Sequence, residues 1–317
     1  MKRIGNIYQQ ICTRENLELA DKRAREGKQE QYGVKVFDRD REGNFTILQD
    51  MLLNKTYSTS MYTTFWIHEP KEREIFRLPY FPDRILHHAV MNIIKKIFVG
   101  MFTSDTYSCI EGRGIHPASY NLRDCLKDVP NTKYCLKIDI AKFYPNIKHA
   151  ILKKLLRRKF KDKNLLWLLD GIIDSAIGLP IGNYLSQFFA NFYLAYFDHW
   201  IKEEKGVVDY LRYLDDMVFL SSSKEYLHRL LADIRQYLAE FLDITLKSNY
   251  QIFLVASRGI DFVGYVHFHE CVYLRKSIKK NFARMIAWNR NDKSIASYMG
   301  WLSHCDGIHL TKKLLWN

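Results

Sequence analysis

The sequence has few of the features that mark secreted, membrane-spanning or loosely tethered proteins. Its 317 residues include only 7 prolines, with no low-complexity linker and no solenoid-length repeat, so we expect continuously packed modules. The six cysteines are scattered and none forms a C-x-x-C pair, which argues against a zinc site and a disulfide framework. No apolar run reaches the roughly 18 residues of a membrane span, and the N-terminus lacks the apolar core of a signal peptide. We therefore expect a cytoplasmic protein that does not enter membranes.

Positive charge, in contrast, is abundant. There are 48 Lys and Arg against 35 Asp and Glu, a net charge of +13, while a hydrophobic fraction of 47% is sufficient for a core. The excess is concentrated in two segments. Residues 148–163 carry eight Lys and Arg against one Asp, and residues 271–317 carry nine against two. Such basic blocks favour a polyanionic partner.

The hydrophobic pattern predicts a mixed α+β chain. Residues 1–60 are expected to be mainly helical, with helix starts at Asn16 and Asp50. Residues 134–140 alternate as a half-buried strand that ends near Asp139, and 207–213 and 217–220 read as two strands around a tight acidic turn. Other expected elements are short strands within 63–87, helices at 88–101, 149–163, from 185 onward and at 224–241, strands near 244 and at 260–268, and a helical C-terminus.

Three carboxylates stand at the predicted strand end and turn: Asp139, Asp215 and Asp216. Adjacent acids repel each other, so the arrangement costs stability unless a cation is bound nearby. Mg²⁺ suits the position because it prefers hard oxygen ligands and keeps substrate phosphates in its shell. Two such ions about 4 Å apart would support an in-line phosphoryl displacement. Taken alone, however, an Asp-Asp dipeptide more often simply closes a polar turn.

Several ordered motifs resemble those of reverse transcriptases. LKIDIAKFYPNI, GLPIGNYLSQFFAN and RYLDDMVFL resemble the three palm motifs, in the same order. FWIHEPKEREIFRLPYFPDR resembles the fingers motifs, YSCIEGRGIHPA the motif before the palm, and GIDFVGY the hairpin before the thumb. The resemblance implies an α+β right-hand polymerase with three parts. These are N-terminal helices and fingers at 1–130, an antiparallel-sheet palm flanked by helices at 131–270 with a basic helical segment at 148–175, and a short helical thumb at 271–317.

The resemblance also implies roles for individual residues at the reacting centre. The metal ligands would be Asp139, Asp215, more weakly Asp216, and the backbone carbonyl of Ile140, holding two Mg²⁺ ions with Mn²⁺ as a substitute. Tyr144 matches the aromatic steric gate that excludes a ribose 2′-hydroxyl, although without the motif it could equally be a core aromatic.

Substrate contacts are implied for a further set of residues. Lys71 and Arg73 match the fingers cations that hold the triphosphate, a task that suits an ammonium and a forked guanidinium. Lys247 is the nominee for the general acid near the nucleotide, although the expected lysine position aligns with Asn249 or Tyr250. For each of these cations a solvated surface charge is the alternative. Contacts to nucleic acid are implied for Arg84, Arg113, Gln187, Lys276, Lys279 and Lys280.

The middle motif departs from the usual pattern. Most reverse transcriptases have Pro-Gln-Gly, where the glutamine contacts the nucleotide, whereas this chain has Ile181 in its place. The I-G-N-x-x-S-Q form and the closing segment SYMGWLSHCDGIHL resemble the reverse transcriptases of diversity-generating retroelements. We hypothesise that Ile181 lowers fidelity by removing a polar contact that favours the correct nucleotide. The alternative is that Ile181 only packs under the loop.

The retroelement resemblance implies a bacterial or phage-encoded enzyme that makes error-prone cDNA from dNTPs on a template RNA and holds the RNA/cDNA duplex. It also implies a ring-forming accessory variability protein as a partner. Two other functions stay open. One is another bacterial reverse transcriptase, from a group II intron, a retron or a phage-defence system. The absence of a Val-Thr-Gly triplet and the lack of room for a maturase or endonuclease module after the thumb count against it. The other is a non-catalytic RNA-binding scaffold, which the three clustered acids argue against.

Overall fold

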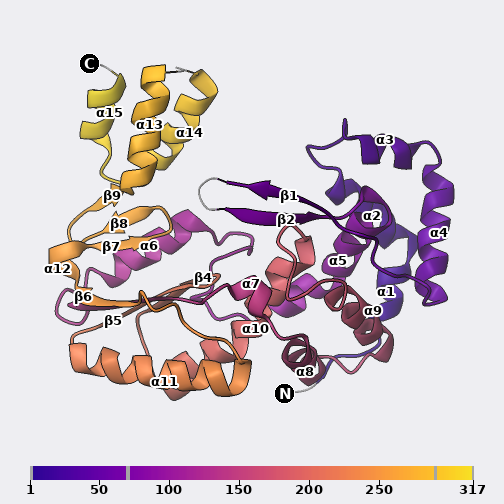
Figure 1. Ribbon diagram of the computed structural model, residues 1–317, viewed down its shortest axis with the longest axis horizontal. Coiled ribbons are helices and arrows are strands. Elements are labelled where there is room, and N and C mark those ends of the chain that lie inside the picture. Colours follow the sequence, from indigo (N-terminus) through magenta and orange to yellow (C-terminus); the bar gives the residue numbers. More distant parts are fainter. Residues whose placement is uncertain (1–2, 69–71, 289–290, 316–317) are drawn as a thin grey trace. The chain divides into compact units, whose positions relative to one another are not determined.

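The computed structural model describes residues 3–68, 72–288 and 291–315, which form two compact units (Figure 1). Unit 1 consists of Met1–Phe102, Lys142–Tyr196 and Phe241–Ile244. Unit 2 consists of Thr103–Ala141, Phe197–Glu240 and Thr245–Asn317. Each unit therefore combines segments that are distant in sequence, and the division at residues 130 and 270 stays a prediction. Across the three described ranges, no helix has the length and apolar character needed to cross a membrane.

The N-terminal part of unit 1 is helical, as predicted. It contains α1 (Tyr8–Cys12), α2 (Arg14–Ala24), α3 (Tyr32–Asp38), α4 (Arg41–Leu53) and, after a π-helical turn (Tyr80–Arg84), α5 (Ile85–Val99).

Both predicted helix starts in this region are wrong. The N-cap of α2 is Thr13, whose side chain accepts from the backbone N–H of Asn16. The N-cap of α4 is Asp40, whose side chain accepts from Gly43. Several residue types can cap a helix, and in both cases an earlier candidate performs that function. Asn16 is instead buried and donates to the carbonyl of Ala89.

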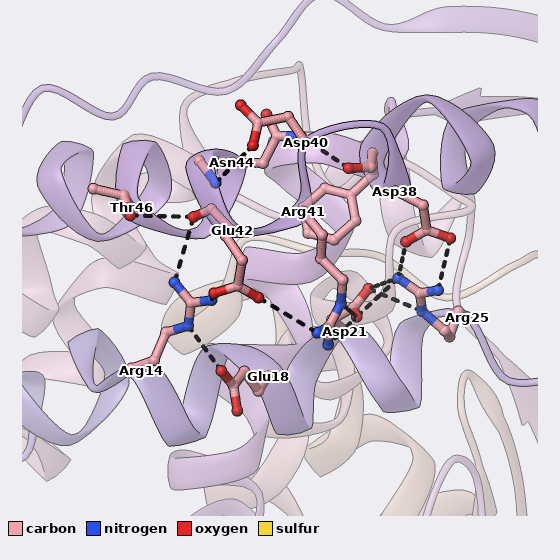
Figure 2. Close-up of polar contacts among 12 residues, drawn as sticks. Arg14, Glu18, Asp21, Arg25, Asp38, Asp40, Arg41, Glu42, Asn44 and Thr46 are labelled. Atoms are coloured by element: carbon pink, nitrogen blue, oxygen red, sulfur yellow. Dashed lines mark hydrogen bonds and ion pairs between the residues drawn. The ribbon is translucent and has the colours of Figure 1, made fainter.

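A polar network joins α2, α3 and α4 (Figure 2). Asp21 is buried, and its carboxylate pairs with Arg25 at 2.7 Å and with Arg41 at 3.1 Å. Arg25 also pairs with Asp38 at 2.8 Å, and the Tyr80 hydroxyl donates to Asp21. A buried carboxylate is tolerated only when its oxygens are partnered, so this network fixes the packing of the helices.

The rest of unit 1 contains one hairpin and further helices. The antiparallel strands β1 (Thr63–Ile67) and β2 (Arg73–Arg77) form a hairpin and confirm the short strands expected within 63–87. The helices are α7 (Phe143–Asn146), α8 (His149–Lys159), α9 (Lys163–Ile173) and most of α10 (Tyr184–His199). Asn191 of α10 is fully buried, whereas Gln187, one turn earlier on the same side of the helix, is exposed.

Unit 2 is built on an antiparallel sheet with the order β4-β5-β3-β6. Its strands are β3 (Tyr134–Asp139), β4 (Tyr210–Tyr213), β5 (Asp216–Ser221) and β6 (Gln251–Leu254). Helices α6 (Ile115–Cys125) and α11 (Lys224–Leu242) lie on opposite faces of this sheet (Figure 1). The strand predicted near residue 244 is wrong. Only a single bridge, between Ile140 and Leu246, forms there, and the sheet pairing resumes at Gln251.

A second, three-stranded sheet in unit 2 precedes the C-terminal helices. The predicted single strand at 260–268 is a hairpin of β7 (Ile260–Phe262) and β8 (Tyr265–His267), followed by β9 (Val272–Leu274). Gly264 turns the hairpin at a φ of +92°, and a Cβ there would lie 2.5 Å from the ring of Trp301. This close approach allows Trp301 to pack on the turn. The chain ends in α13 (Lys276–Trp288), α14 (Asp292–Leu302) and α15 (Ile308–Leu315), and α12 (Val255–Arg258) follows β6.

Candidate active site

Strand pairing in unit 2 assembles the three predicted carboxylates. Asp139 ends β3 and lies opposite Asp216, the first residue of β5. Asp215 occupies the turn before β5, and its carbonyl accepts from the backbone N–H of Ile140. Residues directly opposite each other in an antiparallel pair project from the same face, so the Asp139 and Asp216 side chains are neighbours. The turn and the strand end predicted from sequence thus form one acidic cluster.

The cluster carries an electrostatic cost. Burial, followed by the negative charge of Asp139, raises the pKa of Asp215 to about 6. Burial also raises the pKa of Asp216 to about 6, although the charge of Lys137 opposes the shift. Burial beside another carboxylate therefore makes the charged forms of Asp215 and Asp216 less favourable than those of free acids. A cation placed among them would lower this cost.

Two lysines supply part of that positive charge. The ammonium of Lys247 donates to Oδ2 of Asp139 at 2.5 Å. Lys137 lies 3.4 Å from Oδ2 of Asp216 and also donates to the carbonyl of Asp261. The structure therefore places the nominated Lys247 at the acids. Lys137 was missed, although the alternation of β3 puts it on the same face as Asp139 and could have indicated it.

The donor set fits a divalent cation with oxygen ligands. Oδ1 of Asp139 and Oδ1 of Asp216 are buried and have no hydrogen-bond partner. Buried unpartnered carboxylate oxygens are rare, and they are the ligand type that Mg²⁺ prefers. Among the described residues, no three Asp, Glu, His or Cys side chains are arranged to hold a metal ion by themselves. The remaining ligands would be the predicted Ile140 carbonyl, water and substrate phosphate oxygens.

A cavity of about 410 Å³ adjoins Asp139 in unit 2. Its lining includes Lys137 and Arg258, and the guanidinium of Arg258 lies 5.2 Å from the ring centroid of Phe253. Asn249, which occupies one of the two positions where the sequence alignment expects a lysine, also lines it. The acidic centre is therefore next to a hollow whose lining combines two cations, Lys137 and Arg258, with two carboxylates, Asp139 and Asp261.

In unit 1, the middle motif is joined to the β1–β2 hairpin. The backbone N–H of Phe76 in β2 donates to the carbonyl of Ile181 at 2.8 Å. Gly182 has a φ of +118°, and a Cβ there would lie 2.4 Å from the Phe76 carbonyl oxygen. Only glycine fits this close approach. The half-buried Ile181 is thereby held against β2, whose first residue is the exposed Arg73; Lys71 lies outside the described residues.

A second cavity, of about 490 Å³, lies within unit 1. Gln187, Arg77 and Arg84 line it, together with Lys28. Burial, followed by the positive charge of Arg77, lowers the pKa of Arg84. The fully enclosed His87 also lines it, and its Nε2 has no hydrogen-bond partner. A basic cavity of this kind suits an anionic ligand, and it brings together the predicted Arg84 and Gln187.

Tyr144 lies in α7, which begins after Lys142 in a left-handed conformation. The ring of Tyr144 is half-buried and packs edge to face on Phe143, with centroids 5.9 Å apart. Its carbonyl accepts from Leu179 at 2.9 Å, which ties α7 to the loop before the middle motif. Tyr144 is therefore not a fully enclosed core aromatic, and its steric-gate role stays a prediction.

The other predicted nucleic-acid contacts differ in their surroundings. Lys276, Lys279 and Lys280 are exposed along α13. The guanidinium of Arg113 instead donates to the carbonyls of Thr103 at 2.7 Å and Thr106 at 3.2 Å. Arg113 thus has a structural use in its own loop.

Several of the cations in the basic block 148–163 have partners within unit 1. Lys153 pairs with Asp174, Arg157 pairs with Asp170, and Lys148 lies 3.5 Å from Asp243. Arg158 lies 4.1 Å from the ring centroid of Tyr196. The field of this segment is consequently weaker than its composition suggests, because nearby carboxylates offset much of its charge.

The antiparallel sheet flanked by helices is the architecture of the right-hand polymerase fold. The chain has a TM-score of 0.54 to telomerase from Candida albicans solved in complex with a fragment of telomeric RNA, at 11% identity over 75% of this chain and 52% of that one. At this identity the likeness concerns the fold alone. The sequence profile of the family "Reverse transcriptase (RNA-dependent DNA polymerase)" matches residues 69–267, and the chain belongs to this family.

Two curated bacterial relatives illustrate the range of the family. Protein YkfC of Escherichia coli is 26% identical over 173 residues, which are 50% of this chain and 45% of that protein. The retron Ec83 reverse transcriptase of Escherichia coli is 29% identical over 119 residues, 34% of this chain and 38% of the relative. The chain thus spans less than half the length of either relative.

Proposed function

We propose that the protein is an RNA-directed DNA polymerase that extends a primer with dNTPs by two-metal nucleotidyl transfer. The observation that carries this proposal is the pairing of Asp139 with Asp216 beside Asp215, with a buried, unpartnered Oδ1 on each of the two paired residues. An RNA-binding scaffold gains nothing from clustered acids that face an anionic ligand, because they repel it.

The acidic cluster would hold the catalytic ions. Asp139 and Asp215, with the carbonyl of Ile140 and more weakly Asp216, would bind two Mg²⁺ ions, with Mn²⁺ as a substitute. When bound, these ions would activate the primer hydroxyl and stabilise the leaving pyrophosphate. Lys247, 2.5 Å from Asp139, would donate a proton to the pyrophosphate.

Residues of unit 1 would select the nucleotide and guide the template. Arg73 and Lys71 would hold the triphosphate, and the ring of Tyr144 would exclude a ribose 2′-hydroxyl. The basic cavity with Arg84 and Gln187 would accept template phosphates. In unit 2, Arg113 would contact the template, and Lys276, Lys279 and Lys280 on α13 would hold the RNA/cDNA duplex, giving affinity without sequence choice.

We further propose that the enzyme serves a diversity-generating retroelement. The supporting features are Ile181 in the middle motif, the I-G-N-x-x-S-Q pattern and the closing segment from Ser297 to Leu310. Low fidelity, a ring-forming accessory variability protein and a cytoplasmic site in a bacterial host belong to this proposal. The second candidate is another bacterial reverse transcriptase, which the 29% identity to a retron enzyme favours.

Primer extension on an RNA template with Mg²⁺ tests the polymerase proposal. We expect wild-type protein to incorporate dNTPs and the Asp215→Ala/Asp216→Ala variant to lose incorporation. The matched control is Asp233→Asn, which removes a carboxylate of the same unit from a partly exposed ion pair with Lys205. Equal incorporation by the double variant and the wild type would contradict the polymerase proposal. Tight RNA binding without incorporation by the wild type would favour the scaffold.

Sequencing of the cDNA separates the two candidate subtypes. A retroelement enzyme should make errors concentrated at template adenines, because that is the pattern the resemblance implies. Uniform errors at all four template bases would favour the other bacterial reverse transcriptases. The same RNA should be copied by a retron or group II intron enzyme in parallel, so that errors intrinsic to the template are subtracted.

A further inference from the structure

A fully buried ion pair lies directly behind the acidic turn in unit 2. Arg212 of β4 and Asp198 of α10 both have 0% side-chain exposure. Burying two charges is expensive, and an apolar pair of similar volume often stabilises a core equally well. Stability alone therefore gives a weak reason for this pair, and its geometry suggests a more specific use.

The guanidinium of Arg212 makes several directed contacts. Its Nε donates to Oδ1 of Asp198 at 2.8 Å and its Nη2 to Oδ2 at 2.5 Å, which is a bidentate fork. Its Nη1 donates to the carbonyl of Leu214 at 3.0 Å. Asp198 is fixed in turn by the hydroxyls of Tyr210 at 2.7 Å and Thr106 at 3.2 Å. The bidentate pairing with Asp198 thus orients the Nη1 donor of Arg212 toward the Leu214 carbonyl in the turn.

Leu214 needs such support. It has a φ of +56°, in the left-handed region that non-glycine residues seldom occupy. Its carbonyl belongs to the peptide group that joins it to Asp215, so a hydrogen bond to that carbonyl sets the orientation of the peptide before the acids. The backbone of Arg212 is itself pinned, because its N–H donates to Asp105 and its carbonyl accepts from Tyr107.

We propose that Arg212, held in place by Asp198, is a positioning residue that fixes the Leu214 peptide and thereby the carboxylates of Asp215 and Asp216. The proposal deepens the polymerase function and rests on it for its catalytic consequence. Lysine cannot replace the arginine, because one ammonium lacks the planar fork that reaches Asp198 and Leu214 together. Arg212→Lys keeps the buried charge balanced but loses that geometry.

The test compares Arg212→Lys with Tyr210→Phe, which removes one hydrogen bond from the same buried carboxylate and leaves the Leu214 contact in place. We expect Arg212→Lys to lower kcat about 10²-fold with little change in KM for dNTP, the loss typical of a misplacement near 1 Å. Tyr210→Phe should lower the melting temperature without a comparable loss of kcat. A change in kcat of less than twofold for Arg212→Lys would overturn the proposal.

Hydrogen–deuterium exchange supplies a readout that does not depend on activity. Arg212→Lys should speed exchange in the peptide that spans residues 213–217 and leave α6 and α11 unchanged, whereas equal or globally faster exchange would contradict a local positioning role. If the wild type is inactive, the polymerase function is refuted. The exchange measurement would still test whether Arg212 fixes the peptide before the acids. If Arg212→Lys fails to fold, the Asp198→Leu/Arg212→Met variant removes both charges together. It should fold and show the same local exchange, and wild-type exchange in that variant would overturn the proposal.

Discussion

Asp139 and Asp216 lie directly opposite each other across the antiparallel pair β3–β5, so two carboxylates share one face at adjacent positions. Like charges placed this way destabilise a sheet. The chain offsets part of that cost with one lysine for each carboxylate, Lys247 for Asp139 and Lys137 for Asp216. An arrangement that opposes folding and is only partly neutralised is typical of a functional site, where the remaining charge awaits a ligand.

Removing the Lys247 ammonium should reduce turnover. We expect Lys247→Gln to lower kcat about 10²-fold, the lower end of the usual contribution of a general acid. The pair with Asp139 is about one-third exposed, so its loss should change the free energy of unfolding by less than about 1 kcal/mol. Single-turnover incorporation measures the effect, with Lys224→Gln on the exposed start of α11 as the control. Unchanged turnover would remove Lys247 from the mechanism.

The ring of Tyr144 should govern sugar selection. We expect Tyr144→Ala to narrow the preference for dNTP over rNTP about 10-fold or more, equal to about 1.4 kcal/mol of discrimination. Tyr144→Phe keeps the ring and should retain the preference. Competition between dNTP and rNTP in primer extension measures both variants. If Tyr144→Ala discriminates as well as Tyr144→Phe, the steric gate is elsewhere.

The side chain of Ile181 should influence fidelity. Ile181→Gln introduces the polar group that the reverse transcriptase motif has at this position, and we expect fewer errors at template adenines. The control is Ile177→Gln, the same substitution at a position that is 93% exposed. Deep sequencing of the cDNA gives the error rate at each template base. An error spectrum identical to that of the wild type would leave Ile181 with a packing role only.

Gly182 should not tolerate a side chain. In Gly182→Ala the new Cβ would lie 2.4 Å from the carbonyl oxygen of Phe76, on a backbone with a positive φ. We therefore expect the free energy of unfolding to decrease by about 1–3 kcal/mol. Gly171 on the exposed face of α9 has open space around it, and Gly171→Ala should stabilise by about 0.5–1 kcal/mol. Chemical denaturation of both variants checks the contrast. Equal effects at the two glycines would contradict the close approach.

Unit 2 should lose stability in mild acid through His267. Burial lowers the pKa of His267 to about 4, while its Nε2 lies 2.7 Å from the Ser119 hydroxyl and its Nδ1 3.2 Å from the Ile260 carbonyl. Between pH 6.5 and 4 the unfolded chain binds a proton that the folded unit does not. The contribution of neutral His267 to the free energy of unfolding is therefore present above pH 6.5. It decreases as the pH falls, by about 2 kcal/mol at pH 5.

Urea unfolding at pH 7 and pH 5 measures the effect of His267. The His267→Gln variant should lose about 2 kcal/mol less than the wild type between the two pH values, because glutamine does not titrate. His309→Gln, at an exposed position on α15, should keep the full acid sensitivity. The same acid response in His267→Gln as in the wild type would assign the effect to other buried histidines such as His87, whose pKa burial lowers to about 3.

The local elements of the site follow from sequence patterns alone. Alternation over 134–140 predicted β3 and placed Asp139 at its end, and the acidic dipeptide between two β-prone runs predicted the turn. Such features depend on neighbours a few residues away, so period and turn chemistry suffice to find them. Helix starts were less certain, because Thr13 and Asp40 competed with other capping residues and the pattern does not rank them.

The residues that surround the acids, in contrast, are brought there by tertiary packing. Lys247 is 108 residues from Asp139, and Arg212 reaches both Asp198 and the Leu214 carbonyl from within the core. The same holds for the basic block at 148–163, several of whose cations are paired or stacked within unit 1. These contacts depend on strand register and helix packing between distant segments. A sequence lists the charges, but the register of the sheet and the packing of the helices determine which of them meet.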